Sequence, residues 1–224
     1  MSQFGTVERS EASILATNKV LKNTYMLLAM TLFFSAVMAG LSTSMASSLP
    51  SWTGLASSIA AIAIIWLVLP RVENSAAGVP VVFLFTGLLG FGLGPMLSSY
   101  LSLPNGSQLI MTAMGGTATI FVALSAYVLT SRKDFSFMGG MLMVGFLVII
   151  IAAIANIFLQ MPILSIAISS AVILIMSGFI LYDTSNIIHG GETNYVRATV
   201  SLYLNIYNIF VSLLSLLGAL SNDD

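Results

Sequence analysis

Seven apolar runs, each near the roughly 20 residues that a helix needs to cross a bilayer, occupy most of this 224-residue sequence. They lie at about 24–43, 52–70, 78–98, 107–130, 136–158, 163–183 and 197–220, separated by turns rich in Pro, Gly and Asn. Charged residues make up only 7% of the chain, against about 25% in soluble domains, which is too few to cover a surface that faces water. The sequence therefore predicts an all-α polytopic membrane protein with seven transmembrane helices.

The regions outside these runs are short. A polar tail at 1–23 precedes a single bundle at 24–220, and a tail at 221–224 follows it. The first tail contains Glu8 and Glu11 and is too long for the charged start of a secretory signal. We therefore expect one domain with two tails in water.

The cations are confined to alternate connections. Every Lys and Arg precedes the first run, lies between runs two and three or four and five, or stands where the connection from run six enters run seven: Arg9, Lys19, Lys22, Arg71, Arg132, Lys133 and Arg197. An excess of Lys and Arg marks the cytoplasmic side of a membrane protein. The N-terminus is thus predicted to be cytoplasmic, and seven spans place the C-terminus outside.

The last run carries a polar stripe with helical spacing. Its members follow one another at intervals of three or four residues and so share one helix face: Arg197, Ser201, Asn205, Asn208, Ser212 and Ser215. Amides that face lipid would lack hydrogen-bond partners. We therefore predict that helix 7 is enclosed by the other six. The stripe serves either as interhelical hydrogen-bonding groups or as one wall of a water-accessible ion path.

Asp183 ends the sixth run and is the one carboxylate within or at the edge of a predicted span. Ionisable residues inside membranes are candidates for function. The alternative is that Asp183 simply lies at the cytoplasmic interface. Arg71 and Arg197 are its predicted partners, because they belong to the same side of the membrane. In the third run, Gly90 and Gly94 predict close helix packing, and Pro95 predicts a break or kink.

The residues that membrane enzymes use are scattered or missing. The chain has no Cys and a single His, His189, so a zinc site lacks its usual ligands. An intramembrane aspartyl protease needs a second Asp in addition to Asp183, usually in a Gly-x-Gly-Asp motif. Here Gly92-Leu93-Gly94 is followed by Pro95 in place of that Asp. The net charge of −1 argues against a nucleic-acid partner. We predict a protein that is not an enzyme and has no cofactor of its own.

Several segments resemble the Bax inhibitor (transmembrane Bax-inhibitor-motif) family. They are the stretch 125–137, which ends in Lys-Asp-Phe-Ser-Phe, the Tyr182-Asp183 pair and the Leu202-Tyr203-Leu204 triplet. Longer stretches at 155–160 and 185–195 are similar to bacterial inner-membrane members of the family. The resemblance runs from about residue 18 to the end and implies a seven-helix bundle around an enclosed helix 7.

The resemblance implies two candidate activities. Bacterial members bind the membrane-bound AAA protease FtsH with its HflK and HflC partners and restrain degradation of membrane substrates. Other members are pH-sensitive calcium leak channels that use one carboxylate at the end of helix 6 and one in helix 7. Here Asp183 matches the first acid, but Asn205 occupies the second position, which halves the charge offered to a Ca²⁺ ion.

We therefore interpret the chain as a bacterial inner-membrane modulator of FtsH, and its rival as an ion-conducting bundle around Asp183. In the first hypothesis the N-terminal tail, with Lys19 and Lys22, is the handle that the protease engages. Ca²⁺ enters only in the second, where Asp183 would be its ligand.

Overall fold

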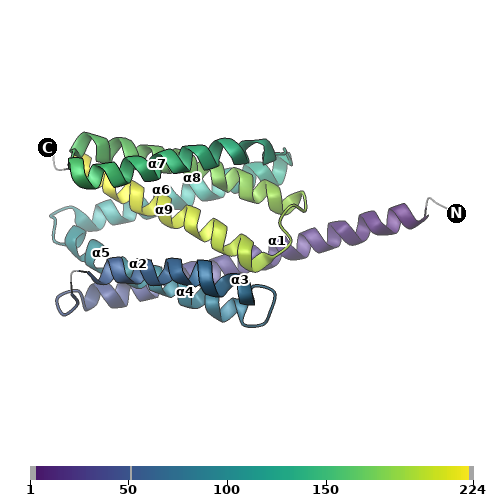
Figure 1. The fold of residues 1–224 in the computed structure, drawn as a ribbon, viewed down its shortest axis with the longest axis horizontal. Coiled ribbons are helices and arrows are strands. Elements are labelled where there is room, and N and C mark those ends of the chain that lie inside the picture. The colour runs from purple at the N-terminus through teal and green to yellow at the C-terminus, as the bar shows by residue number, and fades with distance from the viewer. Residues whose placement is uncertain (1–3, 51, 222–224) are drawn as a thin grey trace. The chain divides into compact units, whose positions relative to one another are not determined.

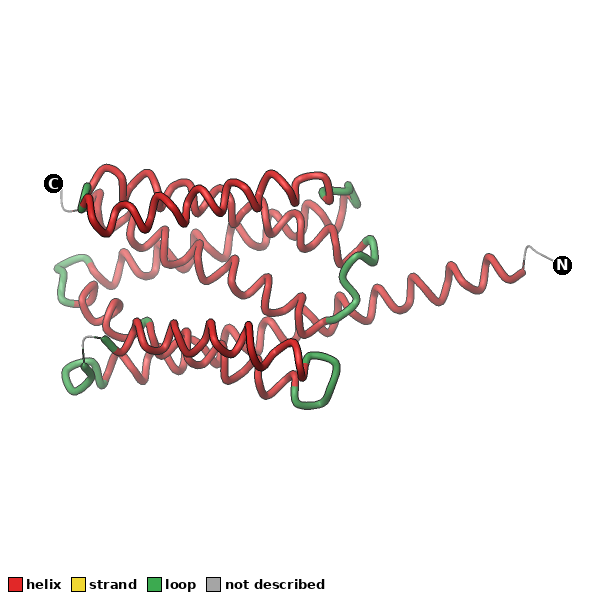
Figure 2. The backbone as a smooth tube through the Cα atoms, viewed as in Figure 1, coloured by secondary structure: helices red, strands yellow, loops and turns green. Residues whose placement is uncertain are grey.

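The computed structural model of the chain describes residues 4–50 and 52–221, with side chains from Leu15 onward. Across these ranges the chain is helical, with short connecting turns and no β-strand (Figure 2). Of the predicted tails, residues 1–3 and 222–224 lie outside the described part. The all-helical fold class predicted from the sequence is confirmed.

Seven segments are long and apolar enough to cross a membrane, as predicted. The α-helices that build them are labelled in Figure 1. In chain order they are α1 (Phe4–Ser44), α2 (Thr53–Ala63) with the π-turn η1 (Ile64–Val68) and α3 (Leu69–Val72), α4 (Gly78–Gly92) with α5 (Gly94–Leu101), α6 (Gly106–Ser131), the 3₁₀ turn η2 (Ser136–Met138) with α7 (Gly139–Leu159), α8 (Pro162–Ile188), and α9 (Tyr195–Ser221).

Two helices are longer than their apolar runs. The first run was predicted from residue 24, but α1 begins at Phe4. The sixth was predicted to end at residue 183, but α8 continues to Ile188. Hydropathy falls where a chain leaves lipid, whereas a helix ends only where its backbone is interrupted. In α8 that interruption comes at Gly190, whose φ of +77° suits glycine best. Asp183 therefore lies inside the helix rather than at its end.

Prolines account for the irregular backbone within two spans. Pro70 cannot donate a backbone hydrogen bond, and just before it the Leu69 N–H bonds to the carbonyl of Ile64, five residues back. This spacing defines a π-turn. In the third span α4 ends at Gly92 and α5 begins at Gly94, next to Pro95. The predicted break at Pro95 is confirmed.

The chain divides into two compact units. Unit 1 comprises the residues up to Asn18, Gln108–Thr193 and the chain from Leu204 onward. Its core is built on Met176, Ile180 and Ile209, and the rings of Phe146 and Phe179 meet edge to face at 6.3 Å between centroids. Aromatic pairs prefer this arrangement.

Unit 2 comprises Lys19–Ser107 and Asn194–Tyr203, and glycines bring its helices together. A Cβ added to Gly90 would collide with Ser35 of α1, and one on Gly94 would collide with Ser42. The close helix approach predicted at Gly90 and Gly94 is thus confirmed. It also places the Ser35 hydroxyl 2.6 Å from the Tyr203 hydroxyl of α9.

The last helix is the most uniformly covered part of the chain. No residue from Ala198 to Ala219 in α9 is exposed, whereas α7 presents many side chains to its surroundings. Such burial supports the prediction of an enclosed helix. Enclosure by all six other spans stays a prediction.

Candidate functional site

Asp183 of α8 and Asn205 of α9 form a direct pair within unit 1. The Asn205 amide Nδ2 donates to the Asp183 carboxylate Oδ2 at 2.7 Å. Asn205 is buried, with 5% of its surface exposed, and Asp183 is partly covered. The 2.7 Å separation lies at the short end of the range for N–H···O hydrogen bonds. The pair therefore ties α8 to α9 within the transmembrane part of the chain.

The other members of the stripe on α9 have separate surroundings. Asn208 donates to the carbonyl of Leu204 in its own helix at 2.8 Å. Ser212 is buried, and Ser201 is partly covered. The bond of Asn205 is interhelical and that of Asn208 is local, and both interpretations of the stripe stay predictions.

The two arginines predicted beside Asp183 make other contacts. In unit 2, Arg197 forms an ion pair with Glu73 at 3.2 Å, and Arg71 donates to the carbonyl of Leu67 in its own span. Asn194 strengthens the first contact, because its Nδ2 donates to the Glu73 carbonyl at 3.1 Å. These bonds fix the turn after α3 to the start of α9. A pairing of Asp183 with either arginine stays a prediction.

Sequence reasoning missed a polar junction at the end of α8. The buried Ser185 hydroxyl accepts the Phe135 N–H at 2.9 Å and lies 3.4 Å from the Lys133 carbonyl. His189 Nδ1 lies 2.9 Å from the Ser185 carbonyl. The junction joins two of the segments that carry the family resemblance, 125–137 and 185–195. The family resemblance of both segments was the only sequence signal that pointed to this junction. The residue types alone did not indicate it.

Asp134 shapes the same connection. Its carboxylate accepts the Ser136 N–H at 2.8 Å, and this bond lowers the pKa of Asp134 below its ordinary value of 3.8, with a smaller contribution from the neighbouring charge of His189. Because the pKa of Asp134 is lower in the folded protein, its bond to Ser136 stabilises the fold fully at pH values above the ordinary pKa of Asp. This stabilisation is lost as the pH falls through the lowered pKa of the folded state.

We expect amide protection at Ser136 to persist at neutral pH and to decline below about pH 3.8, after correction for intrinsic exchange rates. In Asp134→Asn the protection should be weaker and should no longer follow this titration, because an amide oxygen is a weaker acceptor than a carboxylate. Hydrogen–deuterium exchange measures both. Identical profiles for the two proteins would contradict the assignment.

The pair of Asp183 and Asn205 has its own test. We expect Asn205→Leu to destabilise the fold by about 1–3 kcal/mol, because it removes a hydrogen bond to a partly buried carboxyl group. The double variant Asp183→Asn with Asn205→Asp keeps one acid and one amide and should recover most of the loss. Unfolding in mixed micelles gives both values. Equal stability of the Leu variant and the wild type would show that the bond contributes nothing.

Among the described residues, no three His, Cys, Asp or Glu side chains come together as a metal site would require. Asp183 and Asn205 therefore offer one carboxyl group and one amide. These groups can join two helices or provide a single acidic ligand for an ion.

The seven apolar helices make this chain a polytopic membrane protein. The family model described as "Inhibitor of apoptosis-promoting Bax1" matches residues 17–222, and the chain belongs to this family.

Relatives with more specific names match along nearly the whole chain. The "Modulator of FtsH protease YccA" of Escherichia coli K12 is 52% identical over 223 residues, which is 100% of both chains. The same identity holds for the "Inner membrane protein YccA" of a second E. coli strain. An "Uncharacterized membrane protein" of Vibrio cholerae is 50% identical over 210 residues, which is 94% of this chain and 93% of the relative.

Proposed function

We propose that this chain is a bacterial inner-membrane modulator of the FtsH protease, acting by binding FtsH, with HflK and HflC, in the plane of the membrane. The observation that carries the proposal is the 52% identity, over the whole of both chains, to a protein named as a modulator of FtsH. The chain would act by binding and would not catalyse a reaction itself. Its N-terminus is cytoplasmic and its C-terminus lies outside.

The N-terminal segment supplies the point of engagement. An ATP-driven protease starts on a loosely structured end, and chain termini are the regions most prone to fray. Here α1 begins at Phe4, far ahead of the apolar run, so engagement requires the helical cytoplasmic end with Lys19 and Lys22 to fray. Behind it, glycine-packed helices resist extraction and so occupy the enzyme.

Affinity purification in mild detergent tests the binding. The tagged chain is isolated from bacterial membranes, and the proteins that elute with it are identified. We expect FtsH, or its HflK and HflC partners, in stoichiometric amounts. Another tagged seven-span protein expressed at the same level is the control for non-specific recovery. A preparation without any of the three would contradict the proposal.

The position of Asp183 inside a membrane span suggests a second candidate, a cation path through unit 1. In that case Asp183→Asn should change cation flux in liposomes, because it removes the charged stop. Asn205→Asp should add pH dependence between about pH 5 and 8, since two adjacent carboxylates titrate as a coupled pair. Unchanged flux in both variants would exclude this function while leaving the binding of FtsH untouched.

A further inference from the structure

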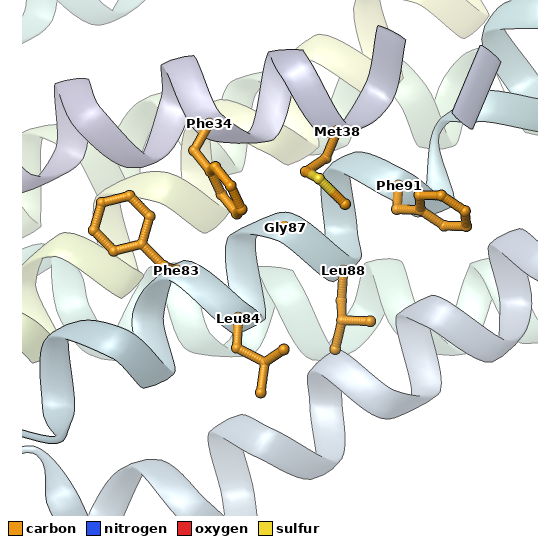
Figure 3. A pocket seen from close by; sticks show the side chains of 7 residues that line it. All are labelled: Phe34, Met38, Phe83, Leu84, Gly87, Leu88 and Phe91. Carbon is orange, nitrogen blue, oxygen red and sulfur yellow. The ribbon is translucent and has the colours of Figure 1, made fainter. Parts of the chain in front are cut away.

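Two adjacent cations lie at the membrane end of α6 in unit 1. Ser131 is the last residue of the fourth span, and the turn that follows it carries Arg132 and Lys133, both exposed. Among the described residues, neither cation forms an ion pair with a carboxylate. Both charges are therefore available to a ligand. By contrast, the groove between α1 and α4 is lined only by apolar residues (Figure 3) and has no group that selects an occupant.

The Lys133 ammonium is held beside the last turns of α6. Its Nζ lies over the ring of Tyr127, 5.8 Å from the ring centroid, within the reach of a cation–π contact. Tyr127 itself lies inside the fourth span, about 6 Å of helical rise before its end at Ser131. A lysine at the edge of a membrane usually extends toward water. Here the contact with Tyr127 keeps the charge near the level of the lipid headgroups.

Contacts with α8 and α6 fix the conformation of this turn. The Ser185 hydroxyl accepts the Phe135 N–H at 2.9 Å and lies 3.4 Å from the Lys133 carbonyl. The ring of Phe135 lies 6.1 Å from the ring of Tyr127. The backbone of Lys133 and the ring beneath its ammonium are thus both held in place. A binding group that is already ordered loses less entropy when its ligand arrives.

The one acid in the turn leaves an excess of positive charge. The Asp134 carboxylate accepts the Ser136 N–H at 2.8 Å, so it points along the chain toward η2, whereas the Lys133 ammonium lies over Tyr127. With two cations and one anion, residues 132–135 carry a net charge of +1. The turn therefore suits an anionic ligand.

The place of the turn at the end of a span indicates the source of the anion. Lys and Arg at the surface of a membrane attract anionic lipids, and a lysine binds phosphate as a point charge. Phe137 is 78% exposed at the start of the fifth span. Its ring offers an apolar surface to the chains of a lipid whose headgroup lies at the turn.

We propose that the turn between α6 and α7 binds the phosphate of an anionic phospholipid, with Lys133 as the main contact and Arg132 as the second cation. The site lies entirely within unit 1 and uses neither Asp183 nor Asn205. It is independent of the proposed binding to FtsH.

Native mass spectrometry of the full chain in detergent, with lipid added in steps, tests the proposal. The wild type should bind phosphatidylglycerol more tightly than the zwitterionic phosphatidylethanolamine. Lys133→Gln should weaken the binding of phosphatidylglycerol about fivefold, the effect of one cation at a membrane surface, and should leave that of phosphatidylethanolamine unchanged. Lys133→Arg keeps the charge and should bind both lipids as the wild type does.

Two further variants separate a defined site from general charge attraction. Lys22→Gln is the matched control, because it removes the same charge from another exposed lysine and should bind phosphatidylglycerol as the wild type does. Tyr127→Leu keeps both cations but removes the ring beneath the ammonium, and should weaken this binding about threefold. Lys133 and Tyr127 are both exposed, so these variants should fold, which circular dichroism verifies.

Equal losses in Lys133→Gln and Lys22→Gln would overturn the proposal, because they would reflect net charge alone. Binding by Tyr127→Leu at the wild-type affinity would also overturn it, since the ring would then not hold the cation. So would an acidic protein that the wild type retains and Lys133→Gln loses while lipid binding stays constant.

Discussion

Deletion of residues 2–20 is expected to abolish degradation of this protein by FtsH while leaving the bundle folded. The remaining part of α1, residues 21–44, is about 36 Å long by helical rise and still crosses a hydrocarbon core of about 30 Å. What is lost is the end on which the enzyme starts. Pulse–chase measurement of protein lifetime in cells with and without active FtsH gives the result directly.

A replacement of residues 2–20 by a Gly–Ser segment of equal length serves as the control. It supplies a loosely structured end, removes Lys19 and leaves Lys22 in place. If this variant is degraded at the wild-type rate, FtsH needs only an accessible end. If the variant protein is instead as long-lived as the deletion variant, FtsH recognises the native residues of the segment. Degradation of the deletion variant at the wild-type rate would show that the tail is not the handle.

Gly90→Ala is expected to destabilise the fold by about 3 kcal/mol, near the upper end of the usual range for overpacking. The added Cβ would overlap the backbone and the hydroxyl of Ser35, so α1 and α4 must separate. That movement also opens the 2.6 Å contact of Ser35 with Tyr203. Unfolding in mixed detergent micelles measures the difference in free energy.

Gly115→Ala is the matched control for this variant. Gly115 also lies inside a transmembrane helix, but a Cβ there meets nothing within 4 Å. Because Ala favours a helix by about 1 kcal/mol over Gly, this variant should be as stable as the wild type or more so. Equal destabilisation of the two variants would contradict the close packing of α1 on α4.

The seven spans could be predicted because lipid imposes one constraint on all of them. Each apolar run had to be helical, since no other open structure satisfies its backbone in hydrocarbon. The ends of the helices were less predictable. Hydropathy drops at Asp183, yet α8 continues to Ile188 because nothing interrupts its backbone hydrogen bonds before Gly190.

The candidate site was predictable only in part. Asp183 and Asn205 were found from their polarity inside apolar runs, and the structure brings them within hydrogen-bonding distance. The role of Ser185 was not predictable, because its partner Phe135 is 50 residues away in sequence and a lone serine in a helix has no distinctive pattern.

The most direct test of the modulator account is the rate at which FtsH degrades a membrane substrate in proteoliposomes that also contain this chain. We expect the rate to fall as the ratio of this chain to FtsH approaches one to one, and to recover when the variant lacking residues 2–20 replaces it. A substrate half-life that stays constant across all ratios would contradict the account.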